Sequence, residues 1–459
     1  MKKSFWLTPL AFFPLFAIAQ APQIDESLKV NLIQLDVKAH SLGGNFLTGL
    51  TEDDFIVREN GVVQEIDKLE LIDVATLEAD RLQDVQSRVM LMVDLINTTY
   101  PVTRRVFPQL KKYVLETWDG KSELGLSLFT NGVIEVVPFT TDREALLAGI
   151  SEATEFYKKN KNRSYGKLDS DAFGGRFISN YDRPELDVVG QYVQYLGAYT
   201  GKKNLILISE NWDATKLAIE SELEDDVFIS MRDIQTAGVF NNLTISSVSL
   251  ARGSKFLNSR NGNFYLEPSA DLAGLTGGTY TKVPLRDAGK AVARTVERGQ
   301  RFYRIQYYSQ YDGRKYRKIN VEVKGMGRLA DSADGFYPRK PELGPADVNL
   351  RLSFDMDYNF TLAASSNWLR WKGSIFGGKR ANYAVAQLAF GAGGQKIAEQ
   401  VIFGELGDGR LTRDNRLRKS FTLPIPKGQK PWKIETTLID LSTGQKVVTE
   451  QIVNKDPSI

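Results

Sequence analysis

Cysteine is absent from the 459-residue sequence, and histidine occurs once, at His40. Without cysteine the chain has no disulfide, no thiol nucleophile and no thiolate metal ligand. His40 lies in a β-rich N-terminal segment, which leaves no Ser-His-Asp triad, Cys-His dyad or HExxH zinc site elsewhere in the chain. Composition leaves carboxylate-only hydrolysis open, but nothing in the sequence fixes two carboxylates at a working distance. We therefore predict that the protein is not an enzyme.

A strong excess of one charge is also lacking. Lys and Arg number 59 and Asp and Glu number 56, which gives a formal net charge of +3. Binding to nucleic acid or to an anionic membrane surface needs a concentrated positive field, so neither partner is expected. The apolar fraction of 42% is that of an ordinary globular protein, and the length suffices for about two to four domains.

Long apolar runs are lacking beyond the N-terminus. There, Lys2 and Lys3 precede an apolar stretch, Phe5 to Ala19, that ends in two small-x-small cleavage motifs. A membrane anchor is the alternative, but the stretch is short and contains two prolines. The pattern predicts a cleaved signal peptide over residues 1–21 and an exported protein, periplasmic or extracellular. No transmembrane segment is expected after cleavage.

Residues 25–78 alternate apolar and polar side chains as strands do. Asn60-Gly61 between two apolar runs is the strongest short signal for a β-hairpin. These residues are predicted to form a small N-terminal β module.

From residue 86 to residue 324, strands alternate with amphipathic helical segments, which is typical of an α/β domain. Asn204–Ser209 is apolar nearly throughout, as a central parallel strand is. Near the end of this region, Tyr303–Tyr308 and Lys315–Val323 are expected to pair as a hairpin around Asp312-Gly313. The predicted fold class is a Rossmann-type domain with a mostly parallel central sheet flanked by helices.

Residues 325–347 are rich in glycine, proline and charge and are predicted to be a linker. Limited proteolysis is expected to cut this linker first. Short strands at near-regular spacing follow, which predicts a C-terminal β-sandwich over residues 348–455.

One predicted strand ends on an acidic residue. Five apolar residues lead into Asp94, and Asn97-Thr98-Thr99 follow. Ligands of open α/β sheets bind outside the carboxyl ends of the strands. Oxygen ligands at such a place suit a divalent cation. The alternative is that Asp94 caps the following turn and binds no metal.

Short motifs along residues 49–338 carry a resemblance to a known family. They are Gly49-Leu50-Thr51-Glu52-Asp53-Asp54-Phe55, Asn60-Gly61, Val93–Thr98, Phe139–Arg143, Lys203–Glu210, Ala273–Gly278, Tyr303–Ile319 and Gly335–Pro338. Their order and spacing resemble the acidobacterial-type VWFA-related family of secreted bacterial proteins, which have a von Willebrand factor A (VWA) domain. The resemblance covers about Leu28 to Pro338.

This resemblance implies a VWA-like fold and a metal-dependent adhesion site. Asp94 and Thr98 match the first loop of that site, Asp-x-Ser-x-Ser, whereas Ile96 replaces its middle serine. Glu210 stands where the usual aspartate follows a central strand. The implied site is therefore degenerate, with Asp94, Thr98 and Glu210 as ligands of Mg²⁺ or another divalent cation.

The second loop of the adhesion site supplies a threonine in the family, and this sequence has no clear match. Ser170 and Ser179 are the nearest hydroxyls in the corresponding loop.

The sequence thus predicts an exported, non-enzymatic protein that binds a protein partner in the envelope or extracellular space. The predicted partner-binding patch consists of Asp94, Asn97, Thr98 and Glu210. A carboxylate at an open sheet edge is expected to be solvated, so Asp94→Ala should change binding more than stability. Two alternatives remain: a carbohydrate-binding or carbohydrate-acting envelope protein that uses the C-terminal β-sandwich, and a structural envelope component without metal.

Overall fold

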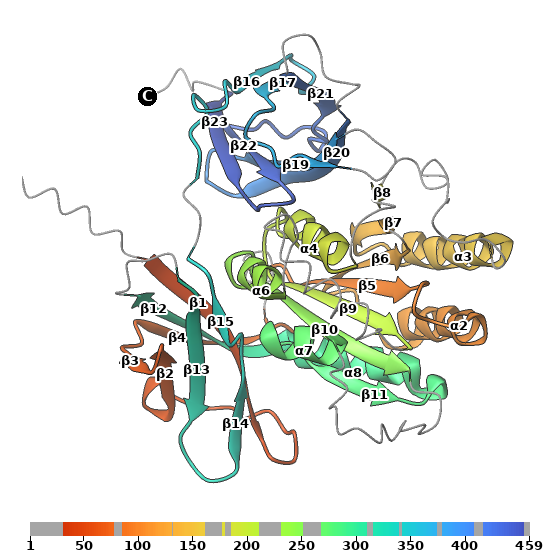
Figure 1. Cartoon of the computed structure of the whole chain (residues 1–459), viewed down its shortest axis with the longest axis vertical. Helices are drawn as coiled ribbons and strands as arrows, with labels where there is room; N and C mark the ends of the chain where they lie inside the picture. Colours follow the sequence, from red (N-terminus) through yellow and green to blue (C-terminus); the bar gives the residue numbers. More distant parts are fainter. Residues whose placement is uncertain are drawn as a thin grey trace, which may run out of the picture.

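A central α/β domain with two β-sandwiches makes up the described part of the chain in the computed structural model (Figure 1). The described residues are 31–77, 85–130, 132–160, 177–179, 185–210, 231–250, 268–309, 315–338, 342–373, 379–407 and 416–453. The predicted fold class, a Rossmann-type α/β domain with a mostly parallel sheet and flanking β modules, is confirmed. The predicted signal peptide, residues 1–21, lies outside the described residues. Among the helices of these ranges, none is long and apolar enough to span a bilayer.

The central sheet contains seven described strands in the order β11-β10-β9-β5-β6-β7-β8. Their bounds are β5 Arg88–Asp94, β6 Glu123–Phe129, β7 Gly132–Thr140, β8 Phe177–Ser179, β9 Lys203–Ser209, β10 Leu243–Leu250 and β11 Tyr280–Val283. Neighbours from β11 to β6 are parallel, whereas the pairs β6–β7 and β7–β8 are antiparallel. Every residue of β5 and β9 is buried, which explains their apolar sequences.

Helices cover both faces of this sheet (Figure 1). One face packs against α2 Tyr100–Glu116, α3 Arg143–Asn160 and α8 Ala288–Gln300. The other face packs against α4 Glu185–Leu196, α6 Met231–Phe240 and α7 Pro268–Leu275. Asp142 caps α3, because its Oδ1 accepts the N–H groups of Glu144 (2.9 Å) and Ala145 (3.1 Å).

The N-terminal β-sandwich consists of two four-stranded sheets, β14-β1-β12-β4 and β15-β13-β2-β3. Their bounds are β1 Asn31–Ser41, β2 Phe55–Glu59, β3 Val62–Gln64, β4 Lys68–Asp73, β12 Arg301–Ser309, β13 Arg317–Val323, β14 Arg328–Asp331 and β15 Gly335–Phe336. Leu35 and Ile305 of one sheet share a core with Val57 and Val321 of the other. The predicted Asn60-Gly61 hairpin is confirmed, with positive φ at both residues between β2 and β3.

The predicted hairpin of Tyr303–Tyr308 with Lys315–Val323 is wrong. β12 pairs with β1 and β4, whereas β13 pairs with β2 and β15, so the two strands lie in opposite sheets. Alternation of apolar and polar residues is the same in a hairpin and in a sandwich, so it does not identify the partner strand. Residues 301–324, predicted to end the α/β domain, instead complete the N-terminal β-sandwich.

Part of the predicted linker 325–347 is also in strands. β14 pairs with β1, β15 pairs with β13, and Phe336 is fully buried. Backbone that is paired in a sheet resists proteases. We therefore expect limited proteolysis to spare residues 328–336, which mass spectrometry of the fragment ends will check. Early cleavage inside this segment would contradict the strand pairing.

The described C-terminal strands form a second β-sandwich. One sheet contains β16 Arg351–Phe354, β17 Asn359–Ser365 and β21 Arg416–Thr422; the other contains β18 Lys372–Gly373, β19 Lys379–Phe390, β20 Lys396–Gly407, β22 Lys433–Asp440 and β23 Lys446–Ile452. Leu362 and Leu417 of the first sheet share a core with Val385 and Leu438 of the second.

The C-terminal β-sandwich packs against the α4 side of the central domain (Figure 1). Ile439 and Leu441 belong to the same apolar core as Val189 of α4. Buried polar groups accompany this contact: Asn382 Nδ2 donates to Gln191 Oε1 at 2.7 Å. The ammonium group of Lys372 pairs with Asp187 of α4, and both side chains are buried. The two parts are therefore docked through a specific surface.

Candidate functional site at the carboxyl edge of the central sheet

The ends of β5 and β9 meet at the carboxyl edge of the central sheet. The two strands are parallel neighbours, with Val93 beside Ile208. Asp94 ends β5, and Ser209 and Glu210 follow at the end of β9. Asp94 and Glu210 therefore lie at the same edge of the central sheet.

Asp94 is fully buried and holds this edge together. Its Oδ1 accepts the backbone N–H groups of Ile96 and Asn97, each at 2.9 Å. Its Oδ2 accepts the hydroxyl of Ser209 at 2.7 Å. Since the first two bonds close the turn after β5 and the third joins β5 to β9, the carboxylate fixes both strand ends. The expectation that Asp94 is solvated is wrong.

Glu210 connects β9 to the start of α2. Its Oε2 accepts both the backbone N–H of Thr99, at 2.9 Å, and the Thr99 hydroxyl, at 2.7 Å. In the opposite direction, the Glu210 backbone N–H donates to Thr98 Oγ1 at 3.1 Å. Thr98 is buried, whereas Thr99 is exposed and Glu210 is partly exposed. The hydrogen-bonded set Asp94, Thr98, Thr99, Ser209 and Glu210 is called the edge network below.

The edge network includes two residues that the sequence did not single out. Ser209 and Thr99 each donate a hydroxyl to a carboxylate of the predicted site. The sequence does give a signal for Ser209, which ends the apolar run Leu205–Ile208 directly before Glu210. Thr99 follows Thr98, and only the fold shows that the second threonine faces Glu210.

Of the two hydroxyl residues suggested for the second loop, only the backbone of Ser179 is described, and it lies away from this site. Ser170 lies outside the described residues. Ser179 ends β8, whose backbone pairs with Gly132 of β7 at the far edge of the sheet. Two strands, β6 and β7, separate β8 from β5.

The edge residues are a poor fit to a divalent cation. Mg²⁺ requires near-octahedral oxygen ligands at about 2.0–2.1 Å, usually carboxylates and water. Both oxygens of Asp94, Thr98 Oγ1 and Glu210 Oε2 already accept hydrogen bonds from the protein. A cation would compete with these donors for the oxygen lone pairs, and several of the bonds are buried. Across the described ranges, no cluster of three or more His, Cys, Asp or Glu residues is placed to hold a metal.

Comparison with known proteins gives neither a matching family model nor a matching curated relative. Solved structures similar to this chain include BatB from Bacteroides thetaiotaomicron, at 12% identity and a TM-score of 0.29, over 46% of this chain and 98% of that one. The vWF domain of the type V pili tip protein Mfa5 from Porphyromonas gingivalis is similar at 9% identity and a TM-score of 0.29, over 47% and 96%.

A von Willebrand factor type A protein from Catenulispora acidiphila is similar over 93% of this chain and 75% of that one, with 9% identity and a TM-score of 0.29. Similarity at this level says nothing of partner or metal. The strand order does characterise the fold. When β5 is counted as the first strand and β8 is left out, the strands from β7 to β11 lie in the doubly wound order 3-2-1-4-5-6. β8 extends the sheet beyond β7. The chain therefore has a doubly wound α/β core.

Proposed function

We propose that the chain is an exported, non-enzymatic binding protein of the VWA type, and that the carboxyl edge of its central sheet binds a protein partner in the envelope or extracellular space. The observation that supports this most directly is the edge network. It fixes the turn between β5 and α2 through at least six hydrogen bonds. A loop that is already ordered loses less conformational entropy when a partner binds.

Exposure divides the predicted patch into two roles. Asp94 and Thr98 are buried and hold the loop in place. Asn97 and Glu210 are partly exposed, and Thr99 is exposed, so these three residues remain accessible to a partner. We therefore propose Asn97, Thr99 and Glu210 as the binding surface, with Asp94 and Thr98 as its support.

Partner binding at this surface is expected to be independent of divalent cations. A photoreactive residue in place of Asn97 should cross-link a partner in the native envelope fraction, with EDTA as well as with Mg²⁺. The matched control carries the same residue in place of Lys112, which is exposed towards the other end of α2. Equal cross-linking at both positions, or none at Asn97, would refute the proposed surface.

The melting temperature tests the cation separately. A ligand that binds only the folded state raises the melting temperature. Because the edge oxygens already accept protein hydrogen bonds, we expect no rise at millimolar Mg²⁺, Mn²⁺ or Ca²⁺. If a cation does raise the melting temperature and Glu210→Ala removes this rise, Asp94, Thr98 and Glu210 form a metal site after all. Ile96→Ser would then be expected to increase the rise in melting temperature.

The carbohydrate alternative receives less support from the C-terminal β-sandwich. Trp368 and Trp371 pack against the sandwich core with Leu362 and Leu417. The indole N–H of Trp371 donates to the Ser366 carbonyl at 3.1 Å. The two indoles therefore act in packing and do not form an open platform on which a sugar ring could stack.

A further inference from the structure

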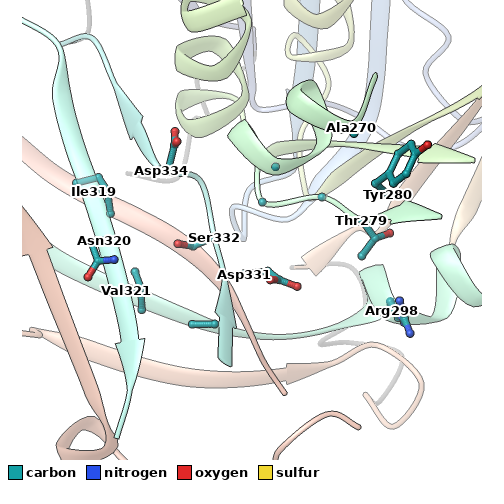
Figure 2. Close-up of a pocket in the computed structure, with 14 residues that line it drawn as sticks. Ala270, Thr279, Tyr280, Arg298, Ile319, Asn320, Val321, Asp331, Ser332 and Asp334 are labelled. Atoms are coloured by element: carbon teal, nitrogen blue, oxygen red, sulfur yellow. The ribbon is translucent and has the colours of Figure 1, made fainter. Parts of the chain in front are cut away.

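A polar cavity of about 440 Å³ lies between the N-terminal β-sandwich and the central domain. Gly277 to Tyr280 and Arg298 of α8 form one side, and residues of β13, β14 and the segment before β15 form the other (Figure 2). Ligand pockets commonly lie between domains and have volumes of about 300–1,000 Å³. The cavity borders β11, which is separated from β5 by β10 and β9, so it is distinct from the edge network.

Arg298 supplies a positive charge on one side of the cavity. Arg298 is exposed, and its guanidinium has no ion pair with any described residue. A second basic residue, Lys38, contacts the Gly277 side of the cavity without lining it: its Nζ donates to the carbonyl of Gly277 at 3.0 Å. Burial lowers the pKa of Lys38 to about 8. Repulsion by Lys202 adds to this decrease, whereas attraction by Asp331 and Asp36 opposes it.

The acidic residues on the other side each contact a side chain other than Arg298. Asp331 Oδ2 is 3.0 Å from His40 Nε2, and Asp334 Oδ1 accepts the hydroxyl of Tyr316 at 3.3 Å and the amide of Gln235. Asn320 is exposed on β13 and lines the same cavity. The cavity thus combines one free guanidinium with side chains that can bind hydroxyl or amino groups.

We propose that this cavity binds a small polar molecule whose carboxylate or phosphate group pairs with Arg298 and whose hydroxyl or amino groups face Asn320 and Asp331. A guanidinium binds either anion through two parallel hydrogen bonds. The Asp331 side chain extends from β14 towards the side that carries Thr279 and Arg298 (Figure 2). An anion bound to Arg298 therefore leaves the rest of the molecule within reach of acceptors on the opposite wall.

Calorimetry of the full chain tests the proposal with three probes: inorganic phosphate, tartrate and succinate. Phosphate tests recognition of a phosphate group, and tartrate tests recognition of a carboxylate. Succinate is a dicarboxylate like tartrate but lacks its hydroxyls. We expect phosphate or tartrate to bind, and Arg298→Gln to weaken that binding by about tenfold or more. Arg294→Gln is the matched control, because Arg294 is exposed on the same helix and does not line the cavity.

His40 reports on the location of binding. It is the one histidine of the sequence, so its imidazole NMR signals need no assignment in a chain without a histidine tag. Because His40 contacts Asp331, binding in the cavity should shift these signals in wild type and in Arg294→Gln. The proposal is overturned if neither phosphate nor tartrate binds at about 20 mM. It is also overturned if Arg298→Gln binds as well as wild type, or if binding leaves the His40 signals unchanged.

Discussion

Asp94→Ala should lower the free energy of unfolding by about 3 kcal/mol, because it leaves buried hydrogen-bond donors without an acceptor. Asp94 is fully buried and accepts bonds from Ile96, Asn97 and Ser209. A methyl group accepts none of them, and the turn after β5 loses its link to β9. Urea unfolding followed by circular dichroism measures the change.

Two variants control for this interpretation. Asp94→Asn keeps one carbonyl acceptor of the same shape, so its loss should be about half as large. Asp119→Ala removes an aspartate whose Oδ1 accepts the Lys121 N–H at 3.0 Å, but Asp119 is exposed, and the loss should stay below about 1 kcal/mol. A loss below about 1 kcal/mol for Asp94→Ala, together with loss of partner binding, would instead support the sequence-based expectation of a solvated carboxylate.

The location of Asp94 could be predicted from the sequence, but its environment could not. A buried apolar strand that ends on a carboxylate is visible in Val89 to Asp94, and parallel strands end at one edge of a sheet. This rule is sufficient to bring Glu210 near Asp94. The burial of Asp94 depends on the Ser209 hydroxyl, 115 residues away along the chain, and on backbone groups of its own turn.

The strands of the central sheet were predictable for a related reason. Both faces of β5 and β9 are covered by helices, so their apolar runs stand out in the sequence. β12 and β13 are buried on alternate residues, and such strands pair equally well with several partners. One partner of each strand, β1 for β12 and β2 for β13, lies more than 250 residues earlier in the chain. No local sequence signal identifies β1 or β2 as that partner.

The same limit concealed how the C-terminal β-sandwich is attached. A linker rich in glycine and proline suggests independent modules. The structure instead joins Arg88 of β5 to Glu399 of β20, 311 residues later, through Nη2 and Oε2 at 2.6 Å. The Thr200 backbone N–H and Lys396 Nζ also donate to the Glu399 carboxylate, at 2.7 Å and 2.8 Å.

Glu399→Ala should therefore destabilise the docked C-terminal β-sandwich by about 3 kcal/mol, the lower end of the cost of breaking a buried ion pair. Arg88 would keep its bond to Glu123, 2.6 Å from Nε, but its Nη2 would lose the carboxylate. Scanning calorimetry should show the C-terminal transition moving to a lower temperature than in wild type. The matched control is Glu405→Ala on the same strand, whose pair with Arg380 is partly exposed, so the loss should be at most about 1 kcal/mol.

Acid should weaken the same contact. Burial by itself raises the pKa of Glu399, but the ion pairs with Arg88 and Lys396 outweigh burial and lower this pKa to about 2 from an ordinary value of 4.5. A carboxylate whose pKa is lower in the folded state contributes stability above about pH 4.5, and loses it as the pH falls towards 2. At pH 3.5 the loss should already be about 1 kcal/mol relative to pH 7. Glu399→Gln cannot titrate, so its difference from wild type should shrink by this amount between pH 7 and 3.5; a difference that stays constant would show that Glu399 does not control the acid response.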